Sequence, residues 1–169
     1  AFEEKISMLE GGVGAMACAS GMSAILLTVL TLAKAGDNVI SLNTIYGGTF
    51  NLFNVTLRKY GIETRFITPD DNAETIEKLI DDKTKLIYTE TIGNPSMVVL
   101  DFDVYAKVCK KYGLPFVVDN TLATPILCRP FEHGANIVIH SSTKYFDGHA
   151  SCVGGLVVDG GNFDWENNP

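Results

Sequence analysis

The 169-residue chain is short of basic residues and has no long uninterrupted apolar run. Its 13 lysines and arginines face 20 aspartates and glutamates, which gives a net charge of −7 and an isoelectric point near 4.8. This balance argues against nucleic acid or an anionic membrane as the main partner. The most apolar stretch, 15–35, is interrupted by Ser20, Ser23 and Lys34, so no membrane span is expected. The first residues, 1–5, are typical of the middle of an amphipathic helix and not of a signal peptide.

The chain also lacks paired cysteine motifs. Four cysteines are widely spaced without a Cys-x-x-Cys pair, at Cys18, Cys109, Cys128 and Cys152. We expect reduced thiols in the core, as free cysteines usually are, and a cytoplasmic protein. His133, His140 and His149 show no zinc-ligand spacing with them, so no metal site is expected. His140, at a strand end, is expected to be a hydrogen-bonded core histidine.

Length and hydrophobic content predict a single α/β domain with a substantial core, since 46% of the residues are hydrophobic. Strands alternate with helices, which indicates a three-layer, mostly parallel, seven-stranded sheet. The expected strands are 15–19, 38–42, 62–67, 85–89, 115–118, 137–139 and 154–158. The third alternates apolar with polar residues and is expected near the sheet edge. The seventh follows too closely for a helical crossover and is expected to be antiparallel.

Helices are expected between these strands. Two are expected over about 21–34 and 49–60, each ending before a glycine. Another is expected behind Asp71, which with Glu74 resembles a capping box. Val104, Val108 and Tyr112 lie at helical spacing and are expected to share one face of a further helix.

Lys144 carries the clearest chemical signal. It follows an apolar run, 137–139, and small hydroxyl residues, 141–143, and it precedes a glycine-rich turn. A lysine delivered from a strand end into such a turn is well placed to have its charge suppressed. A desolvated amine can attack an aldehyde and form a Schiff base. The obvious aldehyde is pyridoxal phosphate (PLP), which is therefore the predicted cofactor.

Four other residues or turns follow predicted strands, at the edge where ligands bind in sheets of this kind. Ser20–Ala24 joins the first strand to its helix. Backbone N–H groups at a helix start bind phosphate, and Gly21 would let an anion approach closely. Turns of small residues also occur without any ligand, so this signal is weak alone.

Asp119 ends an apolar strand, where a carboxylate is costly without a cationic partner or several donors. A protonated pyridine nitrogen would be such a partner, and its protonation makes the ring an electron sink. The alternative is a cap for the next turn, formed with Asn120 and Thr121.

Tyr46 precedes two glycines, so its ring could lie against a flat ligand, or it could be an ordinary core or surface tyrosine. Asn94 precedes Pro95, which favours an extended backbone, and it could reach the ring hydroxyl of PLP. It could also be part of a simple turn.

In this order the residues resemble a known family, the PLP-dependent enzymes of cysteine and methionine metabolism, with the aspartate-aminotransferase-like fold (fold type I). The family includes cystathionine synthases and lyases, methionine γ-lyase and O-acetylhomoserine sulfhydrylase. The resemblance runs from about Phe2 to Trp165. It is most specific over 141–145, with Gly148-His149 and Gly154-Gly155.

The resemblance implies a role for each candidate residue. Lys144 would bind the cofactor and move protons, and Asp119 would pair with the pyridine nitrogen. Tyr46 would stack on the ring and assist the leaving group, while Asn94 would meet the ring oxygen. The phosphate would be held by two backbone N–H groups and two hydroxyls, those of Gly21, Met22, Ser141 and Thr143.

Within the family, Tyr46–Phe53 and Gly160–Trp165 look most like O-acetylhomoserine sulfhydrylases, and Gly48 stands where a Cys would suggest methionine γ-lyase. The resemblance therefore implies γ-replacement on an O-acylated homoserine, with γ-elimination as the alternative. It further implies that 1–169 is the PLP-binding large domain of a homodimer or homotetramer with shared active sites. A preceding segment and a C-terminal small domain would supply a Tyr and an Arg for the neighbouring subunit's phosphate and an Arg for the substrate carboxylate.

Two other motifs fit less well. Gly12-x-Gly14-x-x-Ala17 matches a dinucleotide fingerprint but precedes its strand instead of following one. Ser141-x-x-Lys144 matches the nucleophile motif of β-lactamase-like acyl hydrolases, but the companion Ser-Asp-Asn and Lys-Thr-Gly motifs are absent.

Overall fold

Continuous apolar runs form the centre of the sheet, as the sequence predicts. The computed structural model describes residues 1–167. Its seven strands are β1 (Gly14–Cys18), β2 (Asn38–Leu42), β3 (Glu63–Ile67), β4 (Thr84–Glu90), β5 (Phe116–Asp119), β6 (Ile137–His140) and β7 (Gly155–Asp159). They pair in the order β1-β7-β6-β5-β4-β2-β3. The central strands β4, β5 and β6 are buried on both faces, which is the condition of a covered parallel sheet.

The carboxyl ends of six strands, β1 to β6, lie at the same edge of the sheet. The pairs β2–β3, β2–β4, β4–β5 and β5–β6 are parallel. β7 is antiparallel to both β6 and β1, so β1 and β6 run in the same direction. The segments that follow β1, β2, β4, β5 and β6 therefore all begin at the same edge. The predicted edge position of β3 and the antiparallel β7 are both confirmed.

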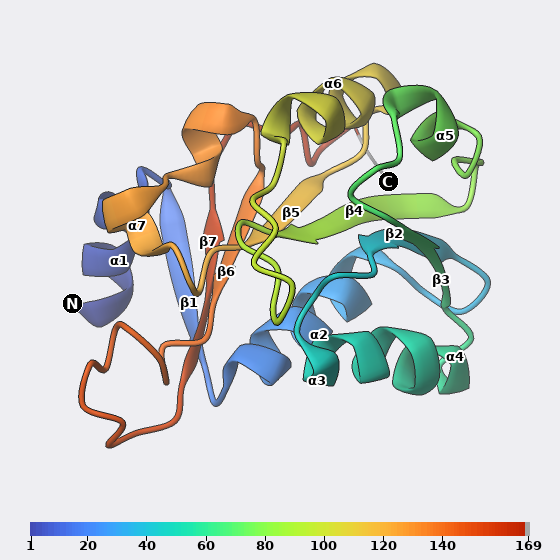
Figure 1. Ribbon diagram of the computed structural model, residues 1–169. Coiled ribbons are helices and arrows are strands. Elements are labelled where there is room, and N and C mark those ends of the chain that lie inside the picture. The colour runs from blue at the N-terminus through green and yellow to red at the C-terminus, as the bar shows by residue number, and fades with distance from the viewer. Residues whose placement is uncertain (168–169) are drawn as a thin grey trace.

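Helices cover both faces of the sheet. They are α1 (Phe2–Glu10), α2 (Gly21–Leu32), α3 (Gly47–Asn51), α4 (Leu57–Lys59), α5 (Ala73–Glu77), α6 (Phe102–Tyr112) and α7 (Thr124–Leu127), with a π-helical turn η1 (Leu52–Thr56) and a 3₁₀ turn η2 (Pro130–His133). Figure 1 shows α2, α3 and α4 on one face and α5 and α6 on the other. The predicted three-layer α/β class is confirmed.

Three local expectations differ from the structure. The N-cap of α5 is Asn72, whose side chain accepts from Thr75 N at 3.0 Å, and not Asp71. Asp71 instead accepts from Thr68 N at 2.6 Å, so it stabilises the preceding turn. The expected helix 49–60 is interrupted by the wider π turn η1. Tyr112 was expected on the same face of α6 as Val108, but its side chain is 41% exposed. The buried residues of α6 are Tyr105, Val108 and Cys109.

The cysteines and His140 can also be compared with expectation. None of the four cysteines is in a disulfide. Cys109 is buried, Cys18 and Cys128 are partly buried, and Cys152 is exposed, so the prediction of core thiols is wrong for Cys152. His140 is 1% exposed and contacts the Glu10 carboxylate, which confirms a hydrogen-bonded core histidine. Among residues 1–167 there is no helix of the length and hydropathy that crossing a membrane requires.

Candidate active site

One pocket is lined by all eight residues that the sequence predicts for the site. It has a volume of about 260 Å³ and lies where the segments after β1, β2, β4, β5 and β6 meet. Its lining includes Gly21, Met22, Tyr46, Asn94, Asp119, Ser141, Thr143 and Lys144. Residues separated by more than 120 positions in the chain thus share one site, because parallel strands deliver their ends to the same edge.

The start of α2 supplies the clearest anion-binding feature. Ser20 and Ser23 form a capping box, with Ser23 N donating to Ser20 Oγ at 3.0 Å and Ser20 N to Ser23 Oγ at 2.8 Å. Gly21 and Met22, the first two residues of the helix, have N–H groups without an acceptor inside it. Both residues line the pocket, so their N–H groups are available to an anion there.

Gly21 is needed for packing as much as for ligand access. A Cβ at this position would lie 2.7 Å from Ser141 Cβ and 2.9 Å from Ser141 Cα. The absence of a side chain therefore lets α2 begin directly against the end of β6. This contact brings the helix start and the Ser141 hydroxyl to one side of the pocket.

The two hydroxyls nominated for phosphate differ in their present partners. Thr143 Oγ1 donates to Gly154 O at 3.2 Å and accepts from Gly154 N at 3.1 Å. The Ser141 backbone is fixed by a bond from its N–H to Thr121 Oγ1 at 2.8 Å, and its own hydroxyl has no hydrogen-bond partner within residues 1–167. The Ser141 hydroxyl can therefore donate to a ligand without breaking an existing hydrogen bond, whereas the Thr143 hydroxyl cannot.

Asp119 caps the turn that follows β5, which is one of the two roles considered for it. Its Oδ1 accepts from Thr121 N at 2.9 Å, as a turn cap does, and its Oδ2 accepts from the Tyr88 hydroxyl at 3.3 Å. Burial raises the pKa of the Asp119 carboxyl, and the bonds from Thr121 oppose that rise. No lysine or arginine in the described part of the chain forms an ion pair with it. A cation placed in the pocket would stabilise the ionised carboxylate.

Tyr46 is held by its backbone, which leaves its ring exposed. Its N–H donates to Glu90 Oε1 at 2.8 Å, and the side chain is 51% exposed at the pocket. A Cβ at Gly48 would lie 2.6 Å from Tyr46 Cε1. Gly48 is thus the residue that allows the ring to fold back over the start of α3.

Glu90 is a site residue that was not singled out from the sequence. Only 7% exposed, it lines the pocket beside Asp119. Burial and then the charge of Asp119 raise the pKa of Glu90 to about 8. Its sequence signal is the one that marked Asp119, a carboxylate at the end of a buried apolar strand, and it could have been found in the same way.

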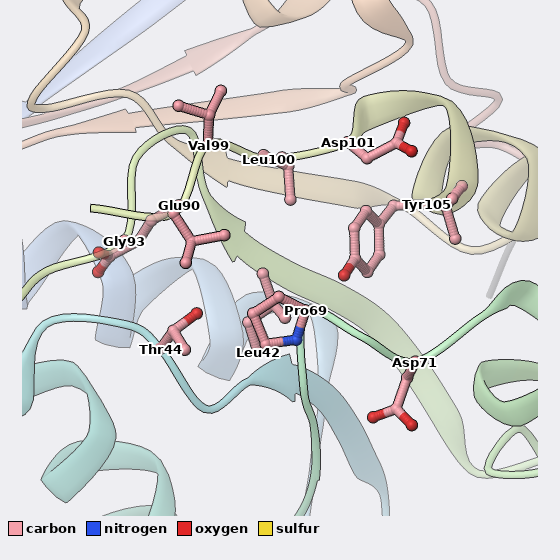
Figure 2. Close-up of a pocket in the computed structure, with 12 residues that line it drawn as sticks. Leu42, Thr44, Pro69, Asp71, Glu90, Gly93, Val99, Leu100, Asp101 and Tyr105 are labelled. Atoms are coloured by element: carbon pink, nitrogen blue, oxygen red, sulfur yellow. The ribbon is translucent and has the colours of Figure 1, made fainter. Parts of the chain in front are cut away.

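Glu90 also lines a second, smaller cavity of about 100 Å³, shown in Figure 2. The Tyr105 hydroxyl is directed into this space in Figure 2. Burial, and then the charges of Asp71 and Asp101, raise the pKa of Tyr105 to about 12, which keeps the phenol neutral. Glu90 therefore lines both this cavity and the candidate site.

Asn94 and Lys144 complete the pocket, and one expectation about Lys144 is wrong. The Asn94 side chain has no hydrogen-bond partner among the described residues, and its peptide bond to Pro95 is cis. Lys144 belongs to a turn, with its N–H donating to Ser141 O at 3.2 Å. Its side chain is exposed, so the burial that was expected around its amine is not present in this chain.

The two less favoured motifs lack the required surroundings. Gly14 and Ala17 lie within β1 itself, so the glycines do not form a turn between a strand and a helix. Ser141 and Lys144 lie in turns after β6 and do not open a helix, as the acyl-hydrolase motif would require.

Comparisons with known proteins agree with this geometry. The family described as Cys/Met metabolism PLP-dependent enzyme matches residues 1–169. The chain belongs to this family. It is 48% identical over 168 residues to a homocysteine synthase of Schizosaccharomyces pombe, covering 99% of this chain and 39% of that protein. It is 44% identical over 165 residues to the O-acetyl-L-homoserine sulfhydrylase of Leptospira meyeri, covering 98% of this chain and 37% of that protein.

A solved structure extends the likeness to three dimensions. A Campylobacter jejuni chain assigned as an O-acetylhomoserine (thiol)-lyase superposes with a TM-score of 0.91 at 38% identity. The match covers 93% of this chain and 39% of that one, and that structure carries a pyridoxyl-lysine phosphate. The predicted fold type and the PLP cofactor are thereby confirmed. The chain spans less than two fifths of the length of these relatives.

The residues of the pocket fit PLP. A helix start with two unused N–H groups and a free Ser141 hydroxyl suit its phosphate. Asp119, a half-buried carboxylate that pairs with no lysine or arginine among the described residues, suits the protonated ring nitrogen. Lys144 supplies an amine at the pocket rim, and the exposed Tyr46 ring offers a flat surface.

Proposed function

We propose that the complete protein is a PLP-dependent transferase that carries out γ-replacement on an O-acylated homoserine. O-acetyl-L-homoserine and sulfide or a thiol would give homocysteine or methionine and acetate, a step of methionine biosynthesis. The observation that carries this proposal is the convergence of Lys144, Asp119 and Tyr46 on one pocket. The printed activities of the relatives, homocysteine synthase and O-acetylhomoserine sulfhydrylase, support the choice of substrate.

Bound PLP supplies an aldehyde that bonds an amine and a ring that accepts the electron pair released at the substrate Cα. Lys144 Nζ would hold the cofactor and would move a proton from the substrate Cα and between Cα and Cβ. Asp119 stays ionised against the ring nitrogen and keeps it protonated. Asp119 ends β5, and Lys144 lies in the turn that follows β6, the strand paired with β5.

The remaining site residues hold and orient the cofactor. Gly21 and Met22 donate N–H groups to the phosphate, and the hydroxyls of Ser141 and Thr143 join them, for which Thr143 must turn from Gly154. Asn94 donates its free side-chain amide to the ring oxygen. Tyr46 stacks on the ring and assists loss of the leaving group from Cγ.

We further propose how this chain relates to the complete protein. Residues 1–169 would form the PLP-binding large domain, and other segments would supply the Tyr and Arg of the shared phosphate site and the Arg for the substrate carboxylate. The assembly would be a homodimer or homotetramer with active sites shared between subunits. Four cysteines without a disulfide support a cytoplasmic location.

Product analysis tests the proposed reaction. The complete protein with PLP is incubated with O-acetyl-L-homoserine, with and without sulfide, and Lys144→Ala is the control. We expect homocysteine and acetate with sulfide, and no turnover in the variant. A 2-oxo acid and ammonia in equal yield under both conditions would instead identify γ-elimination. Absence of acetate release under either condition would contradict the proposal.

A further inference from the structure

A carboxylate from the N-terminal helix lies buried behind the candidate site. Glu10, the last residue of α1, is 1% exposed. Its Oε1 accepts from Asn120 Nδ2 at 3.0 Å and contacts His140 Nε2, while its Oε2 has no hydrogen-bond partner among the described residues. Burying a carboxylate costs free energy of folding, and an apolar residue of similar volume often gives a fold of equal stability. Stability of the fold alone therefore does not account for a carboxylate at this position.

The two partners of Glu10 are the chain neighbours of site residues. Asn120 follows Asp119 at the end of β5, and His140 precedes Ser141 at the end of β6. Asn120 and His140 are 0% and 1% exposed, so neither exchanges its hydrogen bonds with water. A shift of either side chain would move the backbone from which Asp119 or Ser141 projects.

Asn120 extends this contact set to the segment after β4. Its Oδ1 accepts from Thr91 Oγ1 at 2.8 Å, its backbone N–H donates to Ile139 O at 2.9 Å, and its Nδ2 also donates to Cys128 O at 2.9 Å. Thr91 N in turn donates to Asp119 O at 3.0 Å. Through its side chain and its backbone N–H, Asn120 therefore joins the ends of three adjacent strands.

We propose that Glu10 is a positioning residue of the cofactor site, which acts by fixing Asn120 and His140 and, through them, Asp119 and Ser141. The inference rests on the proposed PLP site. The position of Asp119 decides how well it pairs with the ring nitrogen, and that of Ser141 decides how well it meets the phosphate. Glu10 touches neither cofactor nor substrate, so its effect is confined to placement.

The test uses three variants of the complete protein. Glu10→Leu removes both hydrogen bonds at similar volume. Glu10→Gln keeps an oxygen that accepts from Asn120, so it is the conservative rescue. Glu4→Leu is the matched control, because Glu4 lies on the same helix with its side chain 78% exposed. The readouts are the PLP dissociation constant, the ¹⁵N chemical shift of ring-labelled PLP, and kcat and KM for the amino-acid substrate.

We expect Glu10→Leu to weaken PLP binding at least about tenfold, as loss of an outer supporting partner does in metal sites. It should displace the ring ¹⁵N shift and lower kcat roughly 10- to 100-fold with little change in KM, as misplaced groups do. Glu10→Gln and Glu4→Leu should stay within about threefold of the parent protein, well below the loss that misplacement produces.

Four results would overturn the inference or redirect it. If Glu10→Leu does not fold, Glu10→Leu/His140→Leu removes the unpaired imidazole and is measured in its place. Unchanged PLP affinity and ¹⁵N shift in whichever variant folds would contradict it. If neither Glu10→Leu nor Glu10→Leu/His140→Leu folds, Glu10 is a requirement of the fold and the inference fails. If Glu10→Gln weakens PLP binding as much as Glu10→Leu does, positioning by hydrogen bonds is excluded. A parent protein that binds no PLP would refute the proposed function instead.

Discussion

Glu90 should make the cofactor-free protein less stable as the pH rises. Its pKa is about 8 in the folded chain against an ordinary 4.5, so the folded state holds a proton that the unfolded state releases. Stability from this group is greatest below pH 4.5, falls as the pH approaches 8, and is constant above. At about 1.4 kcal/mol per pH unit, the loss between pH 6 and pH 9 is about 2–3 kcal/mol.

The matched variant is Glu90→Gln, which cannot ionise but keeps an oxygen for the bond from Tyr46 N. Urea unfolding of both proteins without PLP would be followed at pH 6, 7.5 and 9. The parent should lose about 2–3 kcal/mol more than the variant over that interval. Equal pH dependence in the two proteins, or a parent that gains stability relative to the variant, would refute the assignment of a buried, protonated Glu90.

Three further predictions concern the cofactor pocket of the complete protein. Asp119→Asn should lower kcat by several orders of magnitude, because a neutral ring is a poor electron sink; steady-state kinetics test this, and a loss under tenfold would contradict it. In Gly21→Ala the added methyl would lie 2.7 Å from Ser141 Cβ and would push the start of α2 away from Ser141. This variant should therefore bind PLP at least about tenfold more weakly, since misplaced groups have effects of that order or more. Gly14→Ala is the fluorescence-titration control, with no atom within 4 Å of its added Cβ. Tyr46→Phe should retain PLP affinity whereas Tyr46→Ala should lose about 1 kcal/mol of it, the size of a ring-stacking contribution; equal affinities would exclude stacking.

The layout of the site was predictable because it follows from strand direction. Apolar runs such as 116–118 and 137–139 identify buried parallel strands, and residues just after them must meet at one edge. Asp119 and Lys144 could therefore be assigned to one pocket from their place in the chain. The same rule applied to Glu90 and would have added it.

Other features depend on contacts that no local pattern reports. Asp71 and Asn72 are both competent caps, and the choice of Asn72 follows from a turn in which Asp71 binds Thr68. Glu10 ends an amphipathic helix like many surface glutamates, and its burial arises only where α1 meets Asn120 and His140. Such pairings are set by tertiary packing, so they become visible only in the structure.

Covalent attachment of PLP to Lys144 is the most direct test of the account. The complete protein would be mixed with PLP, its visible absorbance recorded, and the sample then reduced with borohydride and mapped by peptide mass spectrometry. The account predicts a yellow protein whose reduced adduct lies on the peptide that contains Lys144. A colourless protein, or an adduct on a different lysine with Lys144 unmodified, would contradict it.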